Sequence, residues 1–98
     1  MTKNAVEQKL LKNRNILKKY GVKKLGIFGS YLSGHYKKAS DVDLLVEFDE
    51  TIDLFSFAGL VRELEAVLKK KVDLATAGAL KPYLKDKILG EVEWFAGH

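Results

Sequence analysis

Two segments of the chain carry apolar residues at the spacing of an amphipathic helix. From Thr2 to Tyr20 an apolar residue recurs every three or four positions with lysines between, which predicts a helix that ends at Gly21. A second stripe with the same period runs from Leu54 to about Lys69, with Asp53 as the N-cap. The first stripe comprises Val6, Leu10, Leu11, Leu17 and Tyr20, and the second comprises Phe57, Val61, Leu64 and Leu68, broadened by Leu54, Ala58 and Leu60.

Strict alternation of apolar and polar residues predicts short strands. The clearest is Val42 to Phe48, where the alternate apolar positions form one face and Asp43, Leu45 and Glu47 form the other, which Asp41 also joins. Three shorter strands are expected, the last of them at an edge of the sheet: Lys23–Phe28, Lys71–Ala75 and Val92–Phe95.

The remaining segments complete the predicted order of elements. Tyr31 to Ser40 is expected to begin with a helical turn and continue as a polar loop, and Pro82 fits the first turn of a last helix, Lys81–Leu89, that Gly90 ends. Helices that alternate with strands in this way predict an α/β protein in the broad sense, and more narrowly the α+β class. The expected architecture is a small mixed β-sheet flanked by helices.

Composition excludes several classes of protein. The 98 residues are expected to form one domain over positions 1–98. There is no cysteine, and the two histidines, His35 and His98, lie far apart, so neither disulfides nor a structural zinc site is expected. No apolar run has the length of a signal peptide or a membrane span, so the predicted location is the cytoplasm.

The net charge of +4 is concentrated at the start of the chain, where eight basic residues between Met1 and Lys24 face only Glu7. Such a surface attracts nucleic acid, nucleotide phosphates or an acidic partner protein. It is equally typical of a solvated helix face. Charge alone therefore leaves these alternatives open.

The chemistry is concentrated between Gly29 and Val46. Gly29 and Ser30 end a predicted strand, where backbone N–H groups and a hydroxyl suit phosphate oxygens. Ten residues later, Asp41 and Asp43 lie roughly 6.7 Å apart on one face of the next strand. Two partly buried carboxylates at this spacing repel by roughly 3 kcal/mol, so a cation such as Mg²⁺ is expected between them.

Asp73 is the third candidate acid, provided that its short strand lies beside Val42–Phe48. It could then complete a metal site or accept the proton of an attacking hydroxyl. Each acid also has a structural interpretation: Asp41 as a cap, Asp43 and Asp73 as surface residues. An EF-hand is excluded because Leu45 stands where an oxygen ligand is needed, and a P-loop is excluded because no Gly-Lys-Ser/Thr follows Gly29.

The residues from about Val22 to Val92 resemble the minimal nucleotidyltransferases of the DNA polymerase β superfamily, MntA-like antitoxins among them. That family has Gly-Ser, ten residues, Asp-x-Asp and a later third acid, a pattern that Gly29, Ser30, Asp41, Asp43 and Asp73 match here. The resemblance implies the nucleotidyltransferase fold and magnesium-dependent transfer of a nucleoside monophosphate, AMP from ATP, to a hydroxyl.

The same resemblance implies roles for the residues. Asp41, Asp43 and Asp73 would hold metal, two Mg²⁺ ions in all, with Asp73 as an alternative base, and Gly29 with Ser30 would hold the β and γ phosphates. One departure concerns Ser33, because the family often has a basic residue before the glycine that corresponds to Gly34. Lys37 or Lys38 could supply that charge, or lie in solvent.

Many minimal nucleotidyltransferases act as antitoxins of a HEPN-class toxin, in some cases by adding AMP to a tyrosine of that partner, so a HEPN-type toxin is the expected partner. Neutralisation by contact alone is the first alternative, for which Phe55, Trp94 and Phe95 could form a surface or could instead be core. Transfer to a small molecule or an RNA end is the second alternative. The sequence also leaves open whether the protein forms a homo-oligomer.

Overall fold

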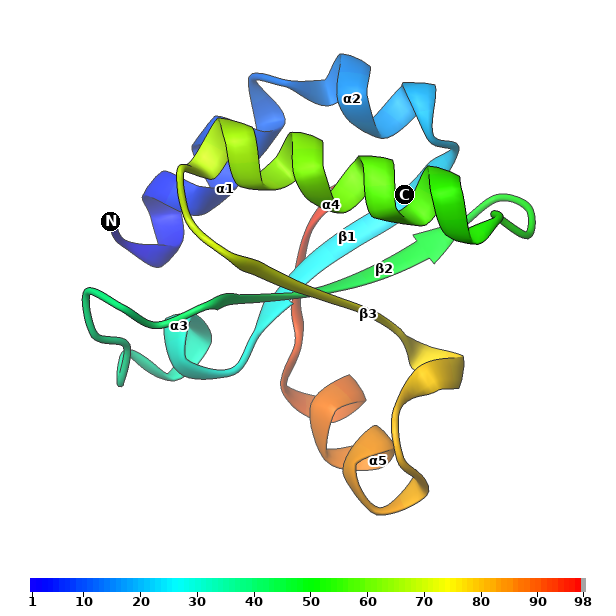
Figure 1. Cartoon of the computed structure of the whole chain (residues 1–98). Coiled ribbons are helices and arrows are strands. Elements are labelled where there is room, and N and C mark those ends of the chain that lie inside the picture. Colours follow the sequence, from blue (N-terminus) through cyan, green and yellow to red (C-terminus); the bar gives the residue numbers. More distant parts are fainter. Residues whose placement is uncertain (98) are drawn as a thin grey trace.

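Four strands form one mixed sheet in the computed structural model, which describes residues 1–97. The strands lie in the order β3-β2-β1-β4; β1 runs antiparallel to both of its neighbours, and β2 and β3 are parallel. Figure 1 shows the twisted sheet crossing the middle of the molecule. The predicted mixed sheet is therefore confirmed, and its strands are β1 (Val22–Phe28), β2 (Val42–Phe48), β3 (Val72–Thr76) and β4 (Glu93–Gly97).

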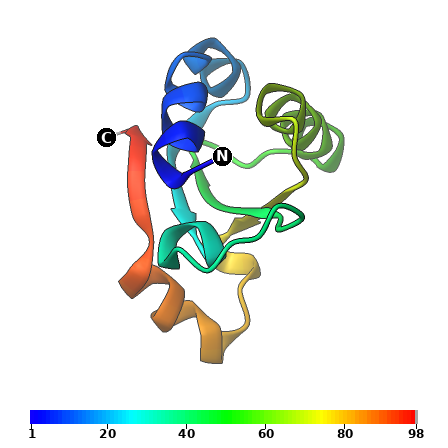
Figure 2. The same cartoon turned by 90° about the vertical axis from the view of Figure 1, so that its left-hand side faces the viewer.

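Helices lie on both sides of this sheet. Three of them, α1, α2 and α4, cover one face, and α5 lies on the opposite side (Figures 1 and 2). A single helical turn, α3, follows β1, and a short 3-10 helix, η1, follows β3. The helices are α1 (Lys3–Leu11), α2 (Arg14–Lys19), α3 (Ser30–Ser33), α4 (Leu54–Leu68), η1 (Ala77–Ala79) and α5 (Pro82–Glu91).

The main core lies between the sheet and the three helices that cover it. Strand alternation turns the apolar side chains of β1 and β2 toward α1 and α4, which bury their own leucines there. Each such side chain contributes about 1.5–3 kcal/mol of burial free energy. The fully buried members are Val6, Leu10, Leu25, Ile27, Val42, Leu44, Val46, Leu60, Leu64 and Leu68.

The first predicted helix is in fact two helices, so the prediction of one continuous helix from Thr2 to Tyr20 is wrong. Its break lies at Asn13, whose side-chain amide donates to the carbonyl of Lys9 at 2.7 Å. Asparagine is a poor helix former because its side chain competes for backbone groups in this way. The break lets α1 bury Val6 and Leu10 while α2 turns Ile16 and Leu17 inward.

The second long helix begins and ends as predicted, but part of its predicted stripe is wrong. Asp53 caps α4, accepting from the backbone N–H of Ser56 at 2.8 Å. Leu54 and Ala58, expected to broaden the buried stripe, are exposed. The first turn of α4 therefore extends past the core that its later turns cover.

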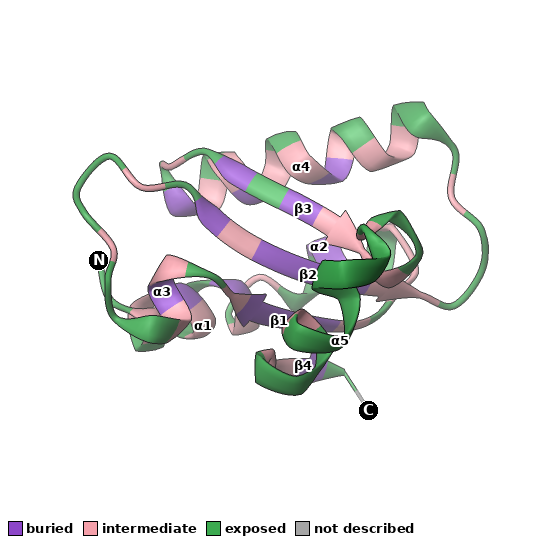
Figure 3. Ribbon diagram, turned by 90° about the horizontal axis from the view of Figure 1, so that it is seen from below, coloured by how far each residue is buried: buried purple, intermediate pink, exposed green. Residues whose placement is uncertain are grey.

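The opposite face of the sheet carries fewer buried side chains. Leu45 is fully buried there, and Gly26 leaves room for Trp94, whose ring a Cβ at Gly26 would approach to 2.9 Å. Helix α5 lies over this side with no buried residue, as its green colour in Figure 3 shows. It continues to Glu91, through the Gly90 that was predicted to end it.

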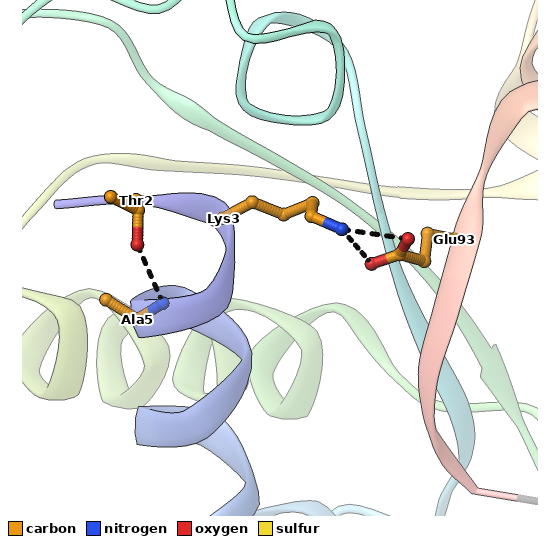
Figure 4. A network of polar contacts seen from close by, with 4 residues as sticks. All are labelled: Thr2, Lys3, Ala5 and Glu93. Carbon is orange, nitrogen blue, oxygen red and sulfur yellow. Dashed lines mark hydrogen bonds and ion pairs between the residues drawn. The ribbon is translucent and has the colours of Figure 1, made fainter.

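The N-terminal helix is tied to the edge strand by an ion pair. Lys3 Nζ donates to both carboxylate oxygens of Glu93, at 2.9 and 2.7 Å, and Thr2 caps α1 through the N–H of Ala5 (Figure 4). Glu7 lies beside the pair, and burial, followed by the neighbouring Glu93, raises the pKa of Glu7 to about 7. This polar cluster joins the two ends of the described chain.

None of the helices within residues 1–97 is both long enough and apolar enough to cross a membrane.

Candidate active site

Gly29 forms the turn between β1 and the next element. Its backbone has φ 73° and ψ −148°, a conformation open to glycine but strained for other residues. A Cβ at this position would overlap Oδ2 of Asp43 and lie 2.9 Å from its Cγ. The glycine is thus needed both for the turn and for the close approach of the Asp43 carboxylate. Ser30 follows at the start of α3, and its backbone N–H acts to lower the pKa of that carboxyl group.

Asp43 and Asp73 occupy paired positions on the parallel strands β2 and β3. Neighbouring strands lie about 4.8 Å apart, so paired side chains on one face approach each other closely. The preceding pair, Val42 and Val72, points into the core, which places the two acids on the opposite face. The condition set for Asp73, that its strand lies beside β2, is therefore met.

The electrostatics of this pair reflect its crowding. Burial, followed by the charge and hydrogen bond of Asp73 and the charge of Asp41, raises the pKa of Asp43 to about 6, while the N–H of Ser30 opposes the shift. Concentrated negative charge disfavours ionisation of the central carboxyl. The same concentration favours a bound cation.

Asp41 lies differently from the other two acids. It immediately precedes β2 and its side chain is exposed, although its charge reaches Asp43. Among residues 1–97, no group of three or more carboxylate, histidine or cysteine side chains is gathered in a way that could hold a metal ion. The structure therefore brings Asp43 and Asp73 together and leaves Asp41 at the rim of the site.

The loop between α3 and β2 is held by contacts that the sequence did not predict. The ring of Tyr36 stacks on that of the buried Tyr31, with centroids 4.4 Å apart. Lys70 Nζ donates to the carbonyl of Lys38 at 2.6 Å. A lysine within the run from Lys69 to Lys71 gives no sequence signal for such a role. These contacts fix the segment that joins Ser30 to Asp41.

Ser33 ends α3 on the surface. Its hydroxyl donates to the carbonyl of Ser30 at 3.3 Å and lies 3.2 Å from Nδ1 of His35. Lys37 and Lys38 are both exposed on the following loop. Neither position tests whether a lysine replaces the basic residue absent at position 33. That replacement therefore stays a prediction.

The decisive observation is a match to a known protein family. The model of the nucleotidyltransferase domain family matches residues 10–95, which is most of the chain. The chain belongs to the nucleotidyltransferase family. The resemblance that Gly29, Ser30, Asp41, Asp43 and Asp73 suggested is confirmed at the level of the family, and the chain is a nucleotidyltransferase by that membership.

Two relatives of this nucleotidyltransferase cover most of its length. A protein of Methanocaldococcus jannaschii, MJ0435, provisionally named a protein adenylyltransferase, is 45% identical over 93% of this chain and 95% of its own. The protein adenylyltransferase MntA of Thermococcus cleftensis is 40% identical over 81% of this chain and 80% of its own.

Solved structures show the same fold. A protein provisionally described as a minimal nucleotidyltransferase has a TM-score of 0.81 at 29% identity, with 95% of each chain covered. A toxin–antitoxin complex with AMP-PNP has a TM-score of 0.76 at 24% identity, covering 94% of this chain and 73% of that one. An MNT antitoxin in complex with tri-AMPylated HEPN toxin of Shewanella oneidensis has a TM-score of 0.70 at 21% identity, covering 99% and 74%. The predicted nucleotidyltransferase fold is thereby confirmed.

Proposed function

We propose that this nucleotidyltransferase transfers AMP from ATP to a hydroxyl group of a partner protein, and that the partner is a HEPN-type toxin which it neutralises. The observation that carries the chemistry is the pairing of Asp43 with Asp73 beside the Gly29–Ser30 turn. The proposed acceptor rests on the relatives, two of which are named as protein adenylyltransferases. The proposed class of partner rests on the complex that contains an AMPylated HEPN toxin.

The donor set fits Mg²⁺. Asp43 and Asp73 offer adjacent carboxylate oxygens, Asp41 adds a third carboxylate at the rim, and Mg²⁺ prefers one or two carboxylates together with water and phosphate oxygens. The raised pKa of Asp43 points the same way, because a bound cation relieves the repulsion that causes it. We assign Asp43 and Asp73 as the principal metal-holding residues, which Asp41 would join by a movement of its exposed side chain from the rim. Mg²⁺ would neutralise the charge on the phosphates and orient them for in-line displacement.

The residues of the turn hold the nucleotide in this proposal. Gly29 is exposed and has no side chain of its own, so its backbone is accessible to phosphate, and Ser30 adds an N–H and a hydroxyl. These donors suit the β and γ phosphates.

The transfer itself is a substitution at phosphorus. The acceptor hydroxyl oxygen forms a bond to the α-phosphorus of ATP, the bond from that phosphorus to the bridging oxygen breaks, and pyrophosphate leaves with that oxygen. The hydroxyl proton passes to a carboxylate, for which we assign Asp73, since it is exposed on the edge strand and so accessible to the acceptor.

A labelling experiment tests this function. The chain, ATP labelled in its α phosphate and Mg²⁺ are incubated with the protein encoded by the neighbouring gene, and the label on that protein is measured. Wild type and Asp86→Asn, which alters an exposed acid of α5, are expected to label it equally. Asp41→Asn with Asp43→Asn is expected to abolish labelling. A double variant that still labels the partner would disprove the mechanism, and one that neutralises the toxin without labelling it would favour neutralisation by contact alone.

A further inference from the structure

Two large apolar side chains at the start of α4 lie in solvent. Leu54 exposes 86% of its surface and Phe55 exposes 90%. These are the two most exposed of the large apolar residues in the described chain, and they are adjacent. Isolated exposed leucines are ordinary, but a projecting leucine–phenylalanine pair is typical of a contact surface. We call this pair the α4 knob.

Acidic residues surround the knob. Asp49, Glu50 and Asp53 are all exposed in the loop that leads into it, and no basic residue lies between them. Asp53 remains on the surface although it caps α4 through Ser56. A protein with a net charge of +4 thus presents one apolar projection with an acidic border. A surface that covers the knob should therefore be apolar at its centre and basic at its edge.

A groove of that kind exists elsewhere in the same chain. A cavity of about 550 Å³ lies between α2, β1 and the edge strand β4. Apolar side chains line it, among them Leu11, Leu17 and Phe95. The volume is large enough to admit both side chains of the knob. We call it the α2–β4 groove.

The border of the groove is basic. Arg14, Lys18 and Lys23 line it, are exposed, and form no ion pair with the acids of residues 1–97. Lys24 also lines it, but its ammonium group turns away, to Glu47 at 3.3 Å and over the ring of Trp94 at 4.0 Å. Asp49 lines the groove as well, so the three cations there outnumber its one acid and are matched by Glu50 and Asp53 beside the knob.

We propose that the α4 knob of one copy of this chain inserts into the α2–β4 groove of a second copy. Asp49 lines the groove and also begins the acidic loop, so the two surfaces are neighbours on one molecule. Reciprocal insertion around a two-fold axis then satisfies both contacts and closes the assembly as a dimer. The groove lies on the helix-covered side of the sheet and the Asp43–Asp73 pair on the other, so the dimer leaves that pair open and does not depend on the proposed function.

The absence of cysteine allows a direct cross-linking test. Phe55→Cys and Lys18→Cys variants are prepared separately, mixed, and treated with a short bismaleimide. The mixture is expected to form a covalent dimer about tenfold faster than a matched mixture of Asp86→Cys with Lys18→Cys, because Asp86 is on α5. Equal rates in the two mixtures would overturn the proposal.

Sedimentation equilibrium provides a second measurement that needs no cross-linker. Wild type is expected to dimerise, and Lys18→Glu and Glu50→Lys are each expected to raise the dimer dissociation constant by about tenfold, while an equimolar mixture of the two variants recovers part of the loss. Both positions are exposed, so the fold should be unaffected. Monomeric wild-type protein, or an open series of larger oligomers, would contradict the closed dimer.

Discussion

Asp43 and Asp73 are separated by thirty positions in the sequence, yet they are direct partners across the parallel strands β2 and β3. The register that aligns Val42 with Val72 in the core sets the two carboxyl groups side by side on the opposite face. Core packing therefore determines the geometry of the site. A slip of one residue between these strands would turn one of the acids inward.

The crowding of these carboxylates predicts a stabilising effect of Mg²⁺. Removing one charge by Asp43→Asn should relieve about 1 kcal/mol of screened repulsion in metal-free protein, which corresponds to a rise of about 4 °C in Tm. Adding Mg²⁺ should raise the Tm of wild type and leave that of the variant nearly unchanged. Calorimetry at pH 8 with and without Mg²⁺ measures both effects. Equal responses of the two proteins to Mg²⁺ would exclude Asp43 as a ligand.

The conformation of Gly29 predicts a severe effect of a single methyl group. Gly29→Ala places a Cβ against the Asp43 carboxylate in a strained backbone conformation, and should cost about 3 kcal/mol of unfolding free energy together with most of the activity. Gly34→Ala is the matched control, because Gly34 also has positive φ, at 83°, but a Cβ there meets no atom within 4 Å. That variant should lose only about 1 kcal/mol.

Urea unfolding of the two glycine variants and of wild type measures these differences. If Gly29→Ala unfolds at the same urea concentration as Gly34→Ala and keeps its activity, the close approach of Asp43 has no importance.

The Glu7–Glu93 pair predicts how stability depends on pH. Because burial and then Glu93 raise the pKa of Glu7 from 4.5 to about 7, the folded chain keeps a proton there that the unfolded chain releases at lower pH. This contribution is fully present below pH 4.5 and is lost as the pH rises through about 7. Glu7→Gln should therefore match wild type at pH 5 and exceed its Tm at pH 8 by about 4 °C.

Thermal unfolding from pH 5 to pH 8 tests this prediction, with Glu91→Gln on the exposed end of α5 as the control. A parallel pH dependence of wild type and Glu7→Gln would show that the pKa of Glu7 is not raised in the folded protein.

A basic residue in place of Ser33 is predicted to improve the binding of ATP. The family often carries a basic residue at this position, and the exposed end of α3 has room for one. Ser33→Arg should lower the KM for ATP by about tenfold through a charge-assisted contact with phosphate. Steady-state labelling at varied ATP gives the KM, and Lys87→Arg on α5 controls for added arginine. An unchanged KM would mean that another group already supplies the charge.

The sequence predicted the strands well, because strands depend on local alternation. Val42 to Phe48 could be assigned a buried face and an acidic face without coordinates, and the structure has these faces. Leu45 is the exception, buried on the acidic face where only tertiary packing could place it.

Features that depend on packing beyond the local pattern were not predictable. The break at Asn13 depends on a side-chain bond to Lys9, and Leu54 has the spacing of a core residue but extends past the core. Trp94 and Phe95 are partly buried, whereas Phe55 is exposed, a distinction that periodicity does not contain. The approach of Asp73 to Asp43 required the pairing of strands whose relative position no local signal encodes.

Transfer of AMP to the partner by the Asp43–Asp73 pair is the central claim, and intact-mass spectrometry of the protein encoded by the neighbouring gene tests it most directly. After incubation with ATP and Mg²⁺, wild type should increase the mass of that protein by one or more AMP groups. The Asp73→Asn variant should remain folded and should leave the mass of the partner protein unchanged. An unmodified partner after treatment with wild type, or equal modification by Asp73→Asn, would contradict the account.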